Sequence, residues 1–254
     1  MNTPTLQPGL TVALITKNEA DNLEACLQSL AGLDAEIVII DSGSTDATAE
    51  IAARHRARFY VHADWPGFGP QRNRAHQYIR TDERLSDALK QSIQTALRTT
   101  PADAHTVFAF NRLSNTFGAF IRHCGWYPDW VVRLYPTAFA RYSDDLVHEK
   151  VLLPADTRVE KLEGDALHYT YANMSQFLSK QNLYSNIWAE QRAAEGKSAG
   201  LGDALLHGIS SFVKMYLLKA GFLDGKHGLL LSVLSAQSAF NKYAALWLLG
   251  KKKP

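Results

Sequence analysis

The chain has 254 residues, which is enough for one large α/β domain or for a typical domain with a helical appendage. Its hydrophobic fraction of 46% and charged fraction of 20% are those of a globular protein and exclude extensive disorder. The net charge of +2 at pH 7 gives no indication of nucleic-acid binding, so no nucleic-acid partner is expected.

The first part of the chain alternates between strand and helix patterns. Residues 11–16, 36–40 and 58–62 are short runs rich in β-branched and apolar residues, which are typical of buried strands. Helical patterns cover residues 20–30 and 45–54 between them. This βαβαβ order predicts an α/β domain with a Rossmann-like, mostly parallel sheet. In such a sheet, ligands bind beyond the carboxyl ends of the strands.

The pattern then changes twice along the chain. A polar helix is predicted after Pro70 and a second helix over residues 86–97, and short strands dominate residues 106–167. From residue 173 onward the pattern is helical, with turn glycines between the helices. We therefore predict a domain of residues 1–171 followed by a helical appendage of residues 172–254.

Cysteine content and the terminal segments indicate the compartment. Cys26 and Cys124 lie far apart without metal-ligand spacing, which favours free thiols in a reducing compartment over a single disulfide. The N-terminal residues lack the pattern of a secretory signal, and polar residues interrupt the apolar stretches near the C-terminus. The sequence therefore predicts a cytoplasmic protein without a transmembrane segment.

Polar residues follow the first two predicted strands, as Thr16-Lys17-Asn18-Glu19 and as Asp41-Ser42-Gly43-Ser44-Thr45-Asp46. Asp41 can accept a hydrogen bond from a ligand N–H, and Ser44 is a candidate N-cap of the next helix. Turn and capping chemistry alone explains an isolated motif of this kind equally well. The presence of two polar strand ends, one βα unit apart, favours a common ligand pocket.

The sequence resembles the family 2 glycosyltransferases, whose first strand ends in a T-x-N-E type motif and whose second ends in D-x-x-S-x-D-x-T. It is most similar to the bacterial subgroup of lipopolysaccharide core glycosyltransferases, whose type member is a β-1,4-glucosyltransferase. The blocks that carry this closer resemblance are Phe68 to Arg72, Gly125 to Trp130, Asp144 to Glu149 and Trp188 to Arg192.

The resemblance implies a GT-A fold and an inverting transfer from a nucleotide-sugar donor, with a UDP-sugar expected. The residues that it assigns to nucleotide binding are Thr16, Asn18, Glu19, Asp41, Ser44 and Arg72. A guanidinium near a diphosphate fits this role, because it can donate two hydrogen bonds to phosphate oxygens. A solvated helix face is the alternative explanation for Arg72.

The segment Asp144 to Glu149 is the candidate for the catalytic base. An inverting transfer needs a carboxylate that takes the proton of the acceptor hydroxyl. Glu149 is the preferred base and Asp145 the competing one, while His148 is a candidate metal or phosphate ligand. The alternatives are an acidic solvated loop for the segment and a structural hydrogen bond for His148. For the aromatic block at Gly125 to Trp130, sugar stacking and loop anchoring are equally compatible with the sequence.

The chain departs from the family where a strand ending in D-A-D-E-R is normal. Asp82-Glu83-Arg84 matches the end of that motif, but Arg80 occupies the position of its first Asp and the preceding apolar strand is missing. The family uses these carboxylates to hold Mg²⁺ or Mn²⁺ against the donor diphosphate. Asp82 remains as a ligand, with Glu83 as a weak substitute, so metal binding and turnover are expected to be weakened.

The C-terminal helical patterns combine apolar faces with lysines over residues 203–253. Such basic amphipathic helices suit the anionic surface of a membrane, here the inner leaflet that would carry a glycolipid acceptor. A helical layer packed on the catalytic domain is the ordinary alternative, and both can hold for one helix pair.

Two functions follow from these patterns. The first is an inverting glycosyltransferase that moves a hexose, with glucose as the candidate, to a lipopolysaccharide core or related glycolipid. The second is a catalytically impaired relative that binds nucleotide or glycolipid as an interaction protein, which is motivated by Arg80. A nicotinamide-dependent oxidoreductase is excluded because no G-x-G-x-x-G follows the first strand.

Overall fold

The structure is a computed structural model that describes residues 10–64, 83–101, 105–136, 140–142 and 151–251. Contacts divide the chain into two compact units. Unit 1 comprises residues 1–112 and 130–168, and unit 2 comprises residues 113–129 and 169–254. The predicted domain boundary at residue 171 stays a prediction. Residues 113–129 belong to the same unit as the C-terminal helices, because the two segments share a hydrophobic core.

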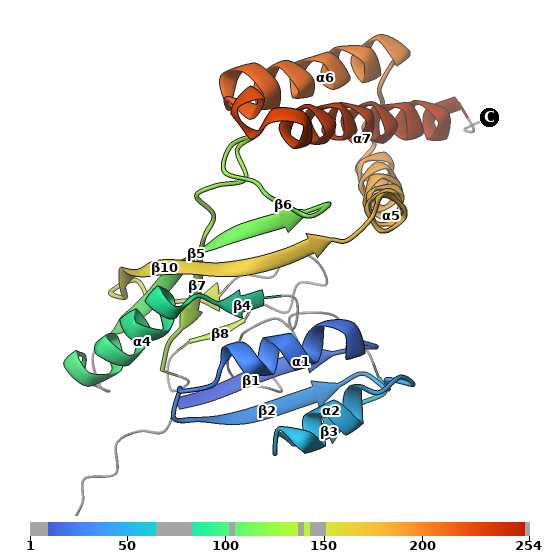
Figure 1. Ribbon diagram of the computed structural model, residues 1–254. Helices are drawn as coiled ribbons and strands as arrows, with labels where there is room; N and C mark the ends of the chain where they lie inside the picture. The colour runs from blue at the N-terminus through green and yellow to red at the C-terminus, as the bar shows by residue number, and fades with distance from the viewer. Residues whose placement is uncertain (1–9, 65–82, 102–104, 137–139, 143–150, 252–254) are drawn as a thin grey trace, which may run out of the picture. The chain divides into compact units, whose positions relative to one another are not determined.

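Unit 1 begins with a parallel sheet in the order β1-β2-β3, as the βαβαβ pattern predicts (Figure 1). Its strands are β1 (Leu10–Thr16), β2 (Ala35–Asp41) and β3 (Arg58–Val61). The helices between them are α1 (Ala20–Ser29) and α2 (Thr48–Arg54). Leu14, Leu23 and Ile39 are completely buried and join strands and helices in one core. The prediction of an α/β fold with a C-terminal helical part is therefore confirmed.

The remaining strands form a second sheet in the order β4-β10-β5-β6, with β7 paired to β5, and a two-stranded sheet of β8 and β9. The pairs β4–β10, β5–β6, β5–β7 and β8–β9 are antiparallel. The strands are β4 (Glu83–Leu85), β5 (Thr106–Thr116), β6 (Ala119–Phe120), β7 (Trp130–Leu134), β8 (Arg141–Tyr142), β9 (Val151–Leu152) and β10 (Arg158–Tyr171).

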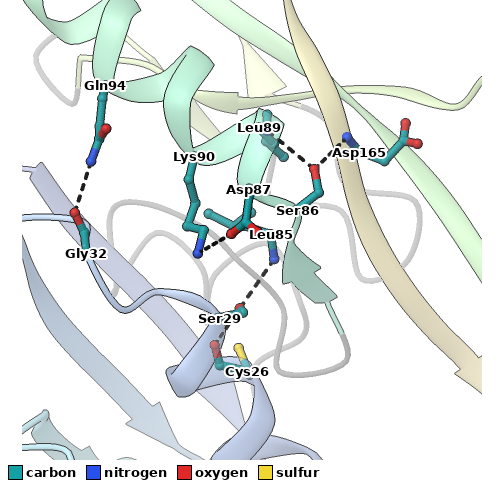
Figure 2. A network of polar contacts seen from close by, with 10 residues as sticks. All are labelled: Cys26, Ser29, Gly32, Leu85, Ser86, Asp87, Leu89, Lys90, Gln94 and Asp165. Carbon is teal, nitrogen blue, oxygen red and sulfur yellow. Dashed lines mark hydrogen bonds and ion pairs between the residues drawn. The ribbon is translucent and has the colours of Figure 1, made fainter.

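Strand β4 starts at the residue after Asp82 and leads directly into helix α4 (Asp87–Thr99). Figure 2 shows the Ser86 hydroxyl at this junction, where it accepts from Leu89 N at 3.3 Å and from Asp165 N at 3.1 Å. Ser86 thus caps α4 and ties it to β10. The neighbouring Gly164 has φ +88°, and a Cβ there would lie 2.3 Å from Leu89 N. This approach of helix to strand therefore requires glycine.

Helices α1 and α2 are joined by an exposed ion pair network at Glu24. The Glu24 carboxylate contacts Arg54 Nη2 at 2.8 Å and His55 Nε2 at 2.7 Å. Hydrogen bonds, first from His55 and then from Arg54, lower the pKa of Glu24 from 4.5 to about 2. Because the folded pKa lies below the unfolded one, the stabilisation is present above pH 4.5 and is lost as the pH falls toward 2.

We therefore expect the difference in unfolding free energy between the wild type and Glu24→Gln to shrink as the pH falls from 4.5 to 2. Urea unfolding at several pH values measures this difference. Glu50→Gln is the matched control, because it removes a carboxylate from α2 without removing a described ion pair. An equal pH dependence of both variants would contradict the assignment to the Glu24 pairs.

Unit 2 is mainly helical, as predicted from residue 173 onward. Its helices are α5 (Met174–Ala194), α6 (Leu201–Val213), the π-helix η1 (Lys214–Leu218), the 3₁₀ helix η2 (Gly221–Asp224) and α7 (Gly225–Lys251). Asn173 caps α5 by accepting from Gln176 N at 3.0 Å. Phe177, Leu231 and Leu234 form a core with Ile121 and Cys124 of the 113–129 segment.

Cys26 and Cys124 are both buried and form no disulfide within the described residues, as the prediction of thiols expects. Cys26 belongs to the core of unit 1 and Cys124 to the core of unit 2. Burial raises the pKa of the Cys124 thiol, which therefore serves as a packing group. Within the described part of the chain, no helix has the length and apolarity needed to cross a membrane.

Candidate functional site

The carboxyl ends of β1 and β2 lie side by side, because Thr16 and Asp41 are partners in the parallel register. Both residues are buried, with 2% and 1% of their surfaces exposed. The Thr16 hydroxyl donates to Asp41 Oδ1 at 2.7 Å. The two polar motifs of the sequence therefore meet at one edge of the sheet.

Asp41 organises the loop that follows β2. Its Oδ2 accepts from the backbone N–H groups of Gly43 and Ser44 at 2.8 and 2.7 Å, and its Oδ1 accepts from the Ser44 hydroxyl. With Thr16, these donors fill the four acceptor positions of a carboxylate. The buried charge is thereby compensated, and the loop is held in a fixed conformation.

The loop after β1 is cross-linked to the loop after β2. Asn18 has a left-handed φ of 52°, which asparagine tolerates better than most residues. Its backbone N–H donates to the Ser44 hydroxyl at 2.8 Å, and its side-chain oxygen accepts from Thr45 N at 2.9 Å. Lys17 Nζ donates to the carbonyl oxygens of Ser42 and Gly43, each at 2.7 Å. Sequence analysis missed Lys17, although it lies inside the first motif.

Ser44 is not the N-cap of the next helix, so that prediction was wrong. Helix α2 begins at Thr48, and Asp46 accepts from its backbone N–H at 3.1 Å and from its hydroxyl. The hydrogen bond from the Thr48 hydroxyl lowers the pKa of Asp46. Ser44 is instead engaged with Asp41 and Asn18, which lie on the sheet side of the loop.

Glu19 lies at the start of α1. Its backbone N–H donates to the completely buried Thr48 hydroxyl at 3.0 Å, and its carboxylate accepts from the Asn22 amide at 3.1 Å. Thr16, Asn18, Glu19, Asp41 and Ser44 thus belong to one network at the carboxyl ends of the parallel strands. Their proposed contacts with a nucleotide stay predictions.

The other predicted site residues lie outside the described residues. These are Arg72, Arg80, Asp82, Asp145, His148 and Glu149. Among the residues that are described, no group of three or more His, Cys, Asp or Glu could hold a metal ion. The base and metal assignments therefore stay predictions.

A buried charge cluster that the sequence did not predict is centred on Glu83. This residue is completely buried, and its Oε1 lies 3.5 Å from Arg133 Nη2 and 3.7 Å from Arg112 Nη1. The two arginines come from β7 and β5, whereas Glu83 begins β4. Two cations beside a fully enclosed carboxylate do not suit a metal ligand, so Glu83 is not the substitute ligand that the motif suggested.

The aromatic block at Gly125 to Trp130 does not act as one surface. Trp126 is partly buried and packs against the core of unit 2. Trp130 starts β7 in unit 1 and has Lys161 Nζ 4.6 Å from the centre of its ring. Part of the Trp126 side chain therefore anchors its loop to the core, and the rest of the Trp126 side chain lines a pocket.

The β1 and β2 strand ends lie in a region that is similar to known proteins. The family model "Glycosyl transferase family 2" matches residues 11–124, which include both strand-end motifs. An uncharacterized glycosyltransferase of Rickettsia prowazekii is 25% identical over 259 residues, covering 93% of this chain and 86% of that protein.

The lipopolysaccharide core biosynthesis glycosyltransferase LpsC of Rhizobium meliloti is 26% identical over 265 residues, covering 92% of this chain and 93% of that protein. The crystal structure of S. aureus TarS 1-349 in complex with UDP is 14% identical, with a TM-score of 0.44, covering 96% of this chain and 90% of that one.

Proposed function

We propose that this chain, which is a glycosyltransferase of family 2, transfers a hexose from a UDP-sugar to a lipopolysaccharide core or related glycolipid. The relationship to a lipopolysaccharide core biosynthesis enzyme over nearly the whole chain supports this acceptor class. Glucose is the candidate hexose.

The observation that carries the proposal is the network between the ends of β1 and β2. Its backbone and hydroxyl groups are held by Asp41 before any ligand arrives, and Asn18 and Thr45 are exposed beside it. A nucleoside needs fixed polar partners of this kind at the carboxyl edge of a parallel sheet. We assign Thr16, Asn18, Glu19, Asp41 and Ser44 to the nucleoside pocket and Arg72 to the diphosphate.

In the proposed transfer, the acceptor oxygen attacks the anomeric carbon while the bond from that carbon to the diphosphate oxygen breaks. Glu149, or Asp145 as the competing candidate, takes the proton of the acceptor hydroxyl. UDP leaves with the bonding electrons. Asp82 and His148 are the proposed ligands of Mg²⁺ or Mn²⁺, which would offset the charge on this leaving group.

The test is the release of UDP from UDP-glucose by the purified protein, with and without Mn²⁺. We expect Mn²⁺-dependent release, and a decrease of tenfold or more in Glu149→Gln, since a general base contributes about 10²–10⁴-fold. Glu163→Gln is the control, because Glu163 is exposed on β10. A decrease in Asp145→Asn with full activity in Glu149→Gln would reassign the base.

A second candidate function is supported by Arg80, which stands where the family has a carboxylate. An impaired relative would bind UDP through the β1–β2 network and turn over no UDP-sugar. Binding of UDP together with absent release from UDP-glucose, UDP-galactose and UDP-N-acetylglucosamine would favour this candidate over the transferase.

We also propose that unit 2 docks on the anionic surface of the inner leaflet through α6, η1 and η2. On α6 the small residues Ala204 and Gly208 are buried, and a Cβ at Gly208 would lie 3.3 Å from the Ala236 carbonyl oxygen of α7. The large apolar side chains point the other way. Those with exposed fractions of 49–76% are Leu205, Leu206, Ile209, Leu217, Leu218, Phe222 and Leu223.

The lysines on this segment complement an anionic surface. Lys214, Lys219 and Lys226 are exposed along η1, η2 and the start of α7. Exposed leucines beside lysines suit the boundary between headgroups and acyl chains. Helix α7 instead packs against both α5 and α6 (Figure 1).

The double substitution Leu206→Ser with Leu218→Ser is expected to weaken binding to phosphatidylglycerol-containing vesicles by at least tenfold. Each leucine is worth about 1.5–3 kcal/mol on full burial, and 1.4 kcal/mol is a factor of ten. Co-sedimentation measures the effect, and Leu183→Ser on α5, where Leu183 is 57% exposed, is the control. Self-association that the double variant abolishes, without vesicle binding by the wild type, would instead assign this face to a second copy.

A further inference from the structure

Unit 2 contains a pocket of about 390 Å³ that the transferase chemistry does not use. It is lined by residues of α5, α6 and α7 and by Trp126, all of which belong to unit 2. Its volume lies in the range of small-molecule sites in proteins. Its lining combines aromatic rings with short polar side chains and one lysine.

The aromatic part of the lining consists of Trp126, Phe177, Trp188 and Tyr243. The ring of Tyr243 is stacked on the ring of His207, with centroids 3.8 Å apart and an angle of 4° between the planes. The centre of the Trp188 ring lies 5.0 Å from the centre of the Tyr243 ring. These contacts fix the orientation of two rings before a ligand binds. A rigid aromatic wall suits the C–H face of a sugar ring, which is flat and apolar.

The polar part of the lining offers hydrogen bonds from several directions. Ser238 Oγ donates to Gln181 Oε1 at 2.7 Å, and the Ser211 and Ser235 hydroxyls lie 3.1 Å apart. Each hydroxyl can make further hydrogen bonds, and the Gln181 amide, which also bonds Tyr171, adds a further donor. An acyl chain in this pocket would displace water from these groups without using their remaining hydrogen-bonding capacity, which is unfavourable. A ligand rich in hydroxyls would satisfy them.

Lys242 supplies the charge of the pocket. Its side chain is half-buried, and within the described part of the chain it takes part in no ion pair. An ammonium group at the edge of a partly enclosed pocket favours an anionic group on the ligand.

We propose that this pocket binds a saccharide that carries a carboxylate or a phosphate, with its ring against Trp188 and Tyr243 and its charge at Lys242. The inference rests on the proposed function only in identifying this saccharide with the glycan of the acceptor. The nucleotide belongs to the β1–β2 network of unit 1.

The test is saturation-transfer NMR of the full chain with glucose, glucuronic acid and glucose 6-phosphate as probes. At least one charged probe is expected to bind tenfold or more tightly than glucose, and the two charged probes distinguish a carboxylate from a phosphate. Lys242→Gln should remove this preference, whereas Lys197→Gln, which removes an exposed lysine of unit 2 outside the pocket, should keep it. Trp188→Ala should lose at least tenfold in affinity for all probes.

Equal binding of glucose and both charged probes, or an unchanged preference in Lys242→Gln, would overturn the proposal. Competition of UMP with the charged probes would also overturn it, because the pocket would then be a nucleotide site. Ser235→Ala, which deletes one hydroxyl from the lining, provides a further variant should Trp188→Ala fail to fold. Because probe binding needs no donor turnover, a protein that binds the probes but releases no UDP would refute only the proposed transfer.

Discussion

Replacement of Glu83 by glutamine is expected to lower the free energy of unfolding by about 3 kcal/mol, because it removes the negative charge of a buried ion pair. Glu83 is completely enclosed, and the side chain of Arg133 is only 7% exposed. Arg112 is 19% exposed and both distances exceed 3.4 Å, which sets the expected value at the lower end of the range for buried pairs.

Urea unfolding of Glu83→Gln against the wild type measures this value, with Glu163→Gln as the control for removing a carboxylate at an exposed position of the same sheet. A difference below about 0.5 kcal/mol, the size of an ordinary surface substitution, would mean that the arginines are compensated by other groups. The Glu83 carboxylate would then have no role in holding β4 against β5 and β7.

The elements of the first sheet could be predicted because local pattern and burial agree there. Val12 to Ile15 and Ile37 to Ile40 are continuous apolar runs, which are typical of strands buried on both faces. Strand β4 could not be predicted in this way. Its sequence, Glu83-Arg84-Leu85, is short and charged, and its burial depends on partners in β5, β7 and β10 that lie far away in the chain.

The polar edge at the ends of β1 and β2 could be predicted from the sequence, but its hydrogen bonds could not. Strand ends with Thr, Asn, Asp and Ser indicate a polar edge, since parallel strands bring their carboxyl ends together. Ser44 and Asp46 are both good helix caps by residue type. Neither of them is the N-cap of α2, because the helix begins at Thr48 and its N-cap is Ala47. The buried Asp41 carboxylate binds the Ser44 hydroxyl, and Asp46 accepts from the N–H of Thr48. These contacts depend on the register of β1 and β2.

The grouping of residues 113–129 with the helices was also beyond the sequence pattern. The backbone N–H and the ring of His123 contact the Asp224 carboxylate at 2.8 and 2.9 Å, and Phe117 packs on Phe177 with ring centres 6.0 Å apart. Each contact joins residues that are far apart in sequence. A pattern read along the chain carries no information about such pairs.

Asp41→Asn is expected to weaken UDP binding by at least tenfold and to lower the unfolding free energy by about 3 kcal/mol, since hydrogen bonds to a charged group contribute about 1.5–3 kcal/mol each. The amide oxygen can still accept from the Thr16 and Ser44 hydroxyls at the position of Oδ1. The amide nitrogen at the position of Oδ2 cannot accept from the N–H groups of Gly43 and Ser44.

Titration calorimetry with UDP, at a temperature where both proteins are folded, separates the two effects of Asp41→Asn. Asp21→Asn is the matched control, because Asp21 is exposed in the first turn of α1. A destabilised variant that still binds UDP with the wild-type affinity would restrict Asp41 to the loop. Loss of both the stability and the UDP affinity would link the two effects, because Asp41 fixes the conformation of the loop that carries Ser44 and Thr45 and contacts Asn18. In that case the buried carboxylate acts on the nucleotide chiefly by holding its other partners in place.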